Sequence, residues 1–229
     1  MVDCVQVGGF WISAREAHRF ADARQHEGIL DLDVRKTDVC LEHCKRFDLA
    51  LDIGAHYGAV SCLLSRRFKR VVAFEPVPDT YEILLRNVEV LSNVEPKPYA
   101  LGAEEAQLYF ETAITHSQLS RVILPNESPA FGAKSARVGP VEAKRLDSLG
   151  LKDVSFIKID VEGFELDVIE GGLDTILASR PLIQIEQGGN EAKFHGRPLH
   201  EASAKLEALG MTRVEGLPFK DDRLFCFLD

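Results

Sequence analysis

The sequence predicts an α/β fold organised around a mostly parallel sheet. Three observations support this: strand-like apolar segments alternate with helix-like segments, a glycine-containing turn follows the first apolar strand, and a hairpin pattern ends the chain. Alternation of this kind gives a parallel sheet with right-handed crossovers. The expected strands are 49–53, 70–75, 95–100, 155–160 and 181–186, and the expected helices are 58–67, 79–91, 164–178 and 198–209.

The C-terminal segments 211–215 and 224–228 complete this sheet. Each is apolar enough for a strand, and between them lie Gly216, Pro218 and several charged residues. Such a pattern is typical of a β-hairpin. We expect the hairpin to close one edge of the sheet, where a nicotinamide-binding fold would normally lack it.

Residues 1–47 precede the first core strand and are expected to form an N-terminal helical cap. Ser13 and Glu16 have the spacing of a capping box, and Gly28 is placed to stop the helix that they begin. A second helical stretch follows before the first core strand. The remaining residues, 48–229, then form the main domain.

A ligand-binding turn is predicted at the end of the first strand, where the pattern Asp52-x-Gly54-x-x-x-Gly58 occurs. Gly54 lets the backbone turn sharply, because a Cβ there would meet either the ligand or the crossing chain. Gly58 lets the next helix begin close to the sheet, with its free N–H groups facing an anionic group. Glu75 ends the neighbouring strand, where its two oxygens can accept both hydroxyls of a ribose. These features together indicate an adenosine-containing cofactor.

Two residues distinguish between the adenosine-containing cofactors. A dinucleotide fingerprint needs a glycine where this chain has His56, and a side chain there crowds a pyrophosphate. Asp52 would repel phosphate but can receive the ammonium of a methionine moiety. S-adenosylmethionine therefore fits better than NAD. A strand, turn and helix without a ligand is the structural alternative for this motif taken alone.

Four motifs, in a fixed order along the chain, carry a family resemblance. They are Asp52–Gly58, Phe74–Pro78 with Leu85–Val88 after it, Arg145–Leu149, and Ile157–Glu165. The chain resembles the FkbM family of S-adenosylmethionine-dependent methyltransferases over about residues 48–187. The resemblance implies a class I methyltransferase (Rossmann-like) fold with a seven-stranded sheet. It also implies O-methylation of a hydroxyl on a sugar, a polyketide or a similar secondary metabolite.

Site residues are expected where the strands end, because open α/β sheets bind ligands at the carboxyl ends of their strands. Methyl transfer is an in-line displacement on a sulfonium, so the protein must align the acceptor oxygen, exclude water and remove a proton. The candidate catalytic residues at these ends are Asp160, Glu162 and Glu186. The cofactor-binding candidates are Asp52, Gly54, Ala55, His56, Gly58, Glu75, Pro76, Ala100 and Asp160.

The carboxylates at the ends of the fourth and fifth strands leave two mechanisms open. Close like charges would raise the pKa of one of them and make a base suited to neutral pH. A Mg²⁺ ion could instead bridge some of them and a substrate diol. We favour metal-independent proton removal and assign no metal ligand, because Asp160 can instead bind the ammonium of the cofactor.

Residues 113–139 are interpreted as a substrate lid. Regular patterning fades here, and a long irregular connection in a compact domain is usually functional or disordered. The segment follows the third strand region, so it should hang over the exposed end of the cofactor. The alternative is an insertion that does not touch the substrate. The lid residues of interest are His116, Ser117, Gln118 and Arg121.

Three histidines lie in positions where a general base could act. His116 and His195 are placed in loops near the predicted mouth, and histidine has the unperturbed pKa nearest to 7. Each can equally be an ordinary surface histidine. His56 is expected to pack over the methionine portion of the cofactor rather than to ionise in catalysis.

Bulk composition limits the classes of partner. The formal charge of −9 and the isoelectric point near 5.3 argue against broad nucleic-acid binding. No apolar segment approaches the length of about 18 residues that a membrane helix needs, and no leader is recognised. Five scattered cysteines are expected to be reduced thiols. We therefore expect a cytoplasmic protein with no membrane segment. The family resemblance implies a small-molecule substrate that carries a hydroxyl.

Two other function classes stay open. A nicotinamide-dependent dehydrogenase would need room for a pyrophosphate, which His56 denies, and a Tyr-x-x-x-Lys or comparable acid, which we do not find. A non-catalytic protein that binds an adenosine cofactor is harder to exclude. Binding of S-adenosylmethionine, S-adenosylhomocysteine and NAD would separate the three.

Overall fold

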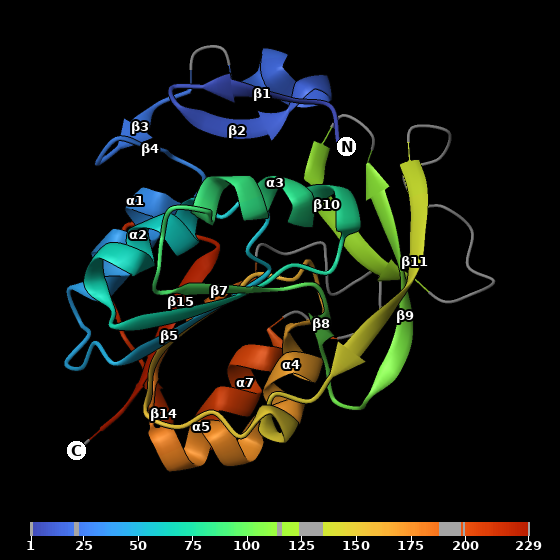
Figure 1. The fold of residues 1–229 in the computed structure, drawn as a ribbon. Coiled ribbons are helices and arrows are strands. Elements are labelled where there is room, and N and C mark those ends of the chain that lie inside the picture. The colour runs from blue at the N-terminus through green and yellow to red at the C-terminus, as the bar shows by residue number, and fades with distance from the viewer. Residues whose placement is uncertain are drawn as a thin grey trace.

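The computed structural model describes residues 2–20, 23–113, 116–123, 135–187, 198 and 200–228. Its centre is a seven-stranded sheet in which β15 alone runs opposite to the other strands (Figure 1). The strand order is β14 (Met211–Arg213), β15 (Asp222–Phe227), β13 (Leu182–Glu186), β12 (Val154–Ile159), β5 (Leu49–Ile53), β6 (Arg70–Phe74) and β7 (Val94–Lys97). The predicted α/β class, parallel core and C-terminal hairpin are confirmed.

Helices cover both faces of this sheet (Figure 1). One face carries α1 (Val34–Leu41), α2 (Ala59–Arg67) and α3 (Pro78–Val88), and the other carries α4 (Glu165–Gly171), α5 (Leu173–Ser179) and α7 (Glu201–Ala208). Successive strand residues alternate between the two cores, so Ala50 packs in the first and Leu51 in the second. Because the strands are buried on both faces, their sequences are nearly continuous apolar runs.

The helix expected over 164–178 is divided into α4 and α5 at Gly172. A Cβ on Gly172 would lie 2.8 Å from Leu146, so the chain passes closely over the Arg145–Leu149 motif. Asp147 of that motif accepts the N–H of Thr175 at 2.8 Å and thereby satisfies a free donor of the first turn of α5. The motif therefore has a structural role in this fold.

The N-terminal segment combines short strands with two helices: the second expected helical stretch is present as α1, whereas the helix expected between Ser13 and Gly28 is wrong beyond Arg19. Before α1 it forms β1 (Cys4–Val7), β2 (Phe10–Ser13), a 3₁₀ helix η1 (Ala14–Arg19), β3 (Gln25–His26) and β4 (Ile29–Leu30). Ser13 makes no side-chain cap bond, and Glu16 is buried against Tyr57. Gly28 (φ +76°) and Glu27 (φ +51°) turn the β3–β4 hairpin, so this glycine reverses a hairpin and does not stop a helix.

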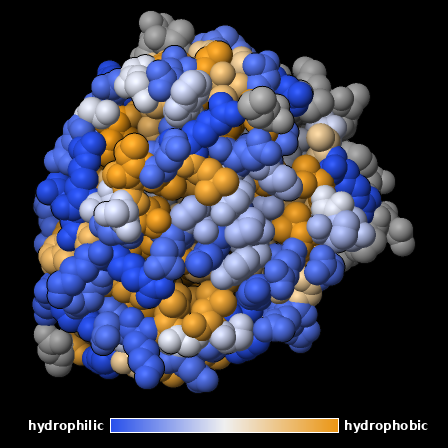
Figure 2. All heavy atoms as spheres, viewed as in Figure 1, coloured by the Kyte–Doolittle hydropathy of each residue, from blue (hydrophilic) through white to orange (hydrophobic). Residues whose placement is uncertain are grey.

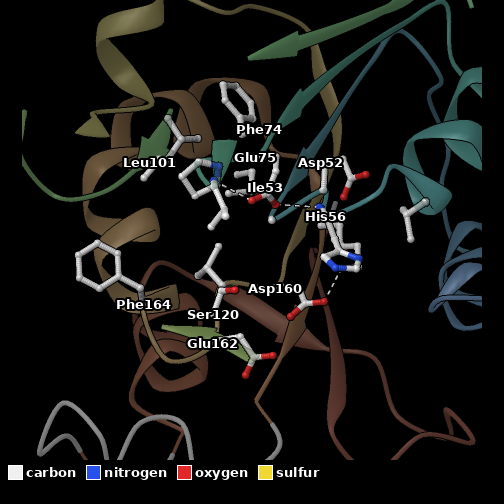
Figure 3. Close-up of a pocket in the computed structure, with 18 of the residues that line it drawn as sticks. Asp52, Ile53, His56, Phe74, Glu75, Leu101, Ser120, Asp160, Glu162 and Phe164 are labelled. Carbon is white, nitrogen blue, oxygen red and sulfur yellow. Dashed lines mark hydrogen bonds and ion pairs between the residues drawn. The ribbon is translucent and has the colours of Figure 1, made fainter. Parts of the chain in front are cut away.

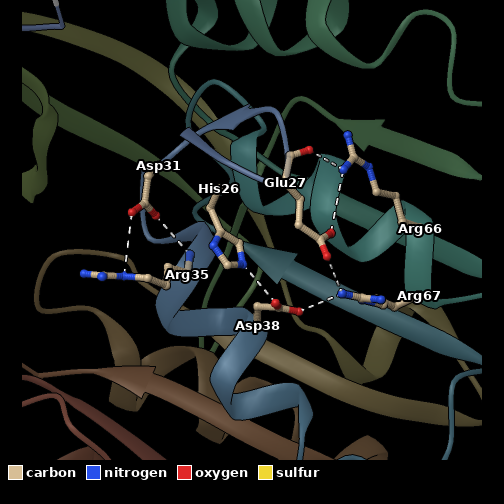
Figure 4. Close-up of polar contacts among 7 residues, drawn as sticks. All are labelled: His26, Glu27, Asp31, Arg35, Asp38, Arg66 and Arg67. Carbon is tan, nitrogen blue, oxygen red and sulfur yellow. Dashed lines mark hydrogen bonds and ion pairs between the residues drawn. The ribbon is translucent and has the colours of Figure 1, made fainter. Parts of the chain in front are cut away.

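Ion pairs hold the β3–β4 hairpin against α1 and α2 (Figure 4). Nε2 of His26 lies 2.9 Å from Asp38, and Arg67 contacts both Asp38 at 3.1 Å and Glu27 at 2.9 Å. The carbonyl of Glu27 accepts a bond from Arg66 at 2.7 Å. Exposed ion pairs contribute only about 0–1 kcal/mol each. The network therefore matters more for positioning the hairpin, and the chain that continues from it, than for stability.

Residues 106–144 contribute most of a second sheet, which we call the small sheet. The described part of 113–139, where an irregular lid was expected, belongs largely to its strands. The strand order of the small sheet is β10 (His116–Ile123), β9 (Ala106–Ala113), β11 (Ser135–Lys144) and β8 (Ala100–Leu101). Much of β9 and β11 is exposed, and a register shift interrupts β11 between Val138 and Val141. Both features weaken the alternation that identifies a strand. Residues 124–134 of the expected lid lie outside the described ranges.

The surface of the molecule is mixed in polarity. On the face shown in Figure 2, hydrophilic and hydrophobic side chains are interspersed. Among the described residues, no helix combines the length and apolar character needed to cross a bilayer.

Candidate active site

A cavity of about 350 Å³ lies where the parallel strands end. The turn after β5, the ends of β6, β12 and β13, and strand β10 of the small sheet enclose it (Figure 3). The fold thus gathers residues that are far apart in the sequence around one hollow. The predicted site residues that line it are Asp52, Gly54, Ala55, His56, Glu75, Pro76, Ala100, Asp160, Glu162 and Glu186.

The two motif glycines are required by close packing within the protein. Gly54 has φ +84°, and a Cβ on it would lie 1.8 Å from the carbonyl oxygen of Asp160. A Cβ at Gly54 was expected to meet either the ligand or the crossing chain. The structure shows that it would meet the crossing chain. Gly58 has φ +85°, and its Cβ would lie 2.5 Å from Leu84 on α3. Gly58 does not line the cavity but lets α2 begin close beneath it.

Asp52 offers an unused acceptor to this cavity. Its side chain is fully buried, and the Ser61 hydroxyl donates to Oδ2 at 2.6 Å. Oδ1 has no hydrogen-bond partner among the described residues. Burial raises the pKa of Asp52, while the charge of Lys158 acts in the opposite direction. A buried carboxylate oxygen without a partner is costly, so this atom is suited to a ligand that brings a positively charged donor.

Glu75 is held by backbone groups at the end of β6. One carboxylate oxygen accepts the N–H of His56 and the other accepts the N–H of Val77, both at 2.9 Å. Burial raises the pKa of Glu75 to about 7, although these two bonds favour its ionised form. Its orientation is therefore fixed before any ligand binds.

Three carboxylates gather at the other end of the cavity. One oxygen each from Asp33, Asp160 and Glu186 lies within 4.8 Å of the other two. The charge of Asp160, followed by burial, raises the pKa of Glu186 to about 8. A like charge therefore acts here as the sequence analysis expected, although the third member of the group is Asp33, where Glu162 was expected.

Two lysines neutralise much of this acidic group. The buried Nζ of Lys158 lies 2.7 Å from Asp160, and its pKa is raised well above the usual range because the attraction of nearby carboxylates outweighs burial. Nζ of Lys36 lies 2.9 Å from Asp33. Oxygen ligands suit Mg²⁺, but here two of the three carboxylates already have a cationic partner. The group therefore fits a divalent cation poorly.

A hydrogen-bonded chain runs along one wall of the cavity. Nε2 of His56 lies 2.7 Å from Oγ of Ser117 on β10, and the Ser117 hydroxyl donates to Glu16 at 3.0 Å. The Tyr57 hydroxyl donates to the same oxygen of Glu16 at 2.9 Å. Burial lowers the pKa of His56 to about 4, so its ring is neutral at neutral pH.

Several predicted residues lie elsewhere. Arg121 does not reach the cavity but forms a buried ion pair with Glu111 at 3.0 Å. Glu165 accepts the N–H of Gly163 at 2.8 Å at the start of α4, which agrees with a local structural role. The side chain of His116 and all of His195 lie outside the described part of the chain, as does the side chain of Gln118.

Sequence reasoning missed two charged residues of the site. Lys158 lies on β12, two residues before Asp160, which directly follows that strand, so period-two alternation could have placed both on one face. Asp33 lies outside the regular elements at the start of α1 and has φ +60°, for which the sequence gives no clear signal. Tyr99, Leu101, Phe110, Val122 and Phe164 supply the apolar wall.

The motifs, the sheet order and the cavity can now be compared with known proteins. Residues 52–211 match the model of the family described as Methyltransferase FkbM domain. The chain belongs to the FkbM methyltransferase family. It is an S-adenosylmethionine-dependent methyltransferase with a class I fold, as the sequence predicted.

Curated relatives of this FkbM methyltransferase are also methyltransferases. The hexuronic acid methyltransferase AglP of Haloferax volcanii is 25% identical over 204 residues, which are 89% of this chain and 80% of AglP. Methyltransferase 1 of Beauveria bassiana is 30% identical over 141 residues, 53% of this chain and 57% of that protein. The shared part therefore covers most of AglP but little more than half of the fungal enzyme.

Solved structures support the fold. A methyltransferase FkbM from Methylobacillus flagellatus KT superposes with a TM-score of 0.51 at 17% identity, covering 80% of this chain and 44% of that one. An O-methyltransferase from Bacillus cereus, in complex with S-adenosylhomocysteine, superposes with a TM-score of 0.50 at 16% identity, covering 93% and 87%. At such low identity these structures support the architecture alone.

Proposed function

We propose that this methyltransferase methylates a hydroxyl oxygen on a sugar or a related secondary metabolite. The observation that carries the proposal is one continuous cavity with two different ends. Glu75 and the free oxygen of Asp52 mark one part, and the acidic group of Asp160 and Glu186 marks the other. The name of AglP, a hexuronic acid methyltransferase, supports a sugar acceptor.

In this proposal the cofactor occupies the part of the cavity beside the turn after β5. Asp52 receives the ammonium group, and Glu75 accepts the ribose hydroxyls. The buried oxygen of Asp52 that has no partner in the described part of the chain favours this placement. In this placement the cofactor is contacted by the backbone or side chains of Gly54, Ala55, His56, Pro76 and Ala100. Gly58 acts indirectly, because it lets α2 begin close to the cavity.

The acidic end would hold the acceptor. S-adenosylmethionine, when bound, supplies a methyl group on a positively charged sulfur, whose C–S electron pair stays with sulfur as the new O–CH₃ bond forms. Asp160 and Glu162 can accept hydrogen bonds from acceptor hydroxyls, and Glu186, with a pKa of about 8, can donate one at neutral pH. Such groups orient a polyol. We propose that this binding needs no metal ion, because Lys158 already pairs with Asp160.

The elements around the cavity suggest how water is excluded. Ser117, Ser120 and Val122 of β10 line it from the small sheet, and Leu32 and Asp33 line it from the N-terminal segment. We therefore propose that residues 113–139 cover the acceptor side of the cavity, which is the role of a substrate lid. Residues 1–47 would form a cap on the methyltransferase domain, 48–229.

Methyl transfer from radiolabelled S-adenosylmethionine tests the proposal directly. The acceptor panel should contain neutral methyl glycosides, hexuronate glycosides, linear polyols and phenols, with product mass and periodate sensitivity used to locate the new methoxy group. We expect transfer to a carbohydrate hydroxyl. Transfer only to the hexuronate carboxylate or to a ring carbon of the phenols would contradict methylation of a hydroxyl. Calorimetry with S-adenosylhomocysteine and NAD provides the binding control, and only the former should bind.

A further inference from the structure

The tautomer of His56 depends on where the single proton of the Ser117 hydroxyl points. Oε2 of Glu16 lies 3.0 Å from Oγ of Ser117 and can only accept this proton. With the proton on that bond, Oγ of Ser117 accepts from His56, and Nε2 of the neutral ring carries the proton. The lone pair of His56 is then on Nδ1, and this nitrogen is the basic one.

The chain of hydrogen bonds crosses the wall between two cavities. A second cavity, of about 440 Å³, lies between the N-terminal segment, α3 and the small sheet. In the described part of the chain, His56 lines the cofactor cavity and not the second one, whereas Glu16 lines only the second. Ser117 and Tyr57 line both. The order His56, Ser117, Glu16 thus leads from the reaction site to a separate space.

We propose that His56 is the general base of the methyl transfer and that Ser117 and Glu16 carry the proton through the wall to the second cavity. This inference rests on the proposed O-methylation, because only a hydroxyl acceptor has this proton to lose. Glu16 and Ser117 act through His56 and are positioning residues, whereas His56 would contact the acceptor.

The proton balance is complete along this path. As the acceptor oxygen bonds to the methyl carbon, its O–H bond breaks and the proton goes to Nδ1 of His56. Nε2 passes its own proton to Oγ of Ser117, and the Ser117 hydroxyl proton goes to the carboxylate of Glu16. Glu16 then releases one proton to water in the second cavity. His56 is neutral again, now with its proton on Nδ1, and a proton shift between the two ring nitrogens through solvent restores the starting tautomer.

The other candidate bases at the site are less suited to this step. Asp160 is held in an ion pair with Lys158, and Glu186 is largely protonated at neutral pH because its pKa is about 8. His56 is unprotonated there, since burial lowers its pKa to about 4. The charged groups that act on the His56 ring are Glu16 and Asp33, which raise its pKa, and Lys158 and Arg19, which lower it.

Tyr57 keeps the accepting end of the path in place. Its hydroxyl bonds Glu16 and lies 2.8 Å from Oγ of Ser117, and the Ser117 N–H also donates to Glu16. Burial raises the pKa of Tyr57 well above its usual range, so it remains a donor. The buried carboxylate is therefore held as an acceptor for the Ser117 proton.

The tautomer can be measured without any acceptor. Long-range ¹H–¹⁵N correlation spectra of the protein bound to S-adenosylhomocysteine report which ring nitrogens carry protons, and His56→Gln assigns the signal. We expect a neutral ring at pH 7 with the proton on Nε2. A proton on Nδ1, or a doubly protonated ring at that pH, would overturn the proposal.

Turnover of matched variants tests the path itself. Glu16→Gln and Ser117→Ala should each lower kcat by about 10²-fold, the lower end of what a positioned base supplies, with the KM for S-adenosylmethionine unchanged. Ser117→Thr keeps the hydroxyl and should recover most of the rate. Thr112→Val is the control, because Thr112 also lines the second cavity, and its hydroxyl lies 3.1 Å from that of Ser120, which is outside the proposed path.

The outcomes separate this inference from the proposed function. Wild-type kcat in both Glu16→Gln and Ser117→Ala would overturn the relay even if sugars are methylated. An equal loss in Ser117→Thr, or losses confined to the KM, would mean that the network only supports the fold. If the wild type methylates no hydroxyl acceptor, the O-methylation proposal fails, and the inference that depends on it fails with it whatever tautomer the spectra give.

Discussion

Replacing Gly54 with alanine should destabilise the protein more than the same change at Gly216. Both glycines have φ +84°, so alanine incurs a similar conformational penalty of about 1–2 kcal/mol at each. An added Cβ at Gly54 would lie 1.8 Å from the Asp160 carbonyl oxygen, whereas none of the described atoms lies within 4 Å of that position at Gly216. Relieving the overlap means separating β5 from β12, where the Asp160 N–H bonds the Ile53 carbonyl at 3.0 Å.

The expected difference between these two variants can be estimated. Overpacking typically costs about 1–3 kcal/mol, so Gly54→Ala should lose about 2–5 kcal/mol and Gly216→Ala about 1–2 kcal/mol. Urea unfolding followed by circular dichroism measures both values, and calorimetry with S-adenosylhomocysteine measures the site. We expect binding to be lost in Gly54→Ala and kept in Gly216→Ala. Equal destabilisation, or wild-type affinity in Gly54→Ala, would refute this account of the turn.

Glu75→Ala should weaken S-adenosylmethionine binding by about 1.5–3 kcal/mol, the range for hydrogen bonds to charged groups, and unchanged calorimetric affinity would remove Glu75 from the ribose site. The pKa of Glu75 is about 7, and in the proposed site its ionised form would accept both ribose hydroxyls, so wild-type affinity for S-adenosylhomocysteine should rise with pH through about 7 and then level off; a flat profile would count against this contact. Glu162→Gln should lower turnover by about 10²-fold with cofactor affinity preserved, since misalignment of the acceptor alone costs that much. Wild-type turnover in that variant would mean that Glu162 does not orient the acceptor. EDTA should leave the rate unchanged, and a loss that Mg²⁺ restores would establish the metal-assisted mechanism.

The sequence alone determined the core of the fold and half of the site. The parallel strands are buried on both faces, so their apolar runs, such as Leu49–Ile53, are visible without any knowledge of neighbours. Gly54 and Glu75 were also predictable, because the turn and the following strand are close in sequence and their geometry depends on local backbone constraints. The FkbM motifs then identified the family.

Only the tertiary structure decided the remaining features. Glu16 looked like a helix cap within its own segment, yet it bonds Ser117, which lies 101 residues away. His56 meets the same serine across 61 residues, and Asp33 joins Asp160 and Glu186 from a segment outside the motifs. Local periodicity reports which face of an element is buried, but not which distant side chain meets it there. The hydrogen bonds from His56 to Glu16 and the group of three carboxylates exist because the N-terminal segment and the small sheet pack over the strand ends, and this packing depends on contacts that no local pattern encodes.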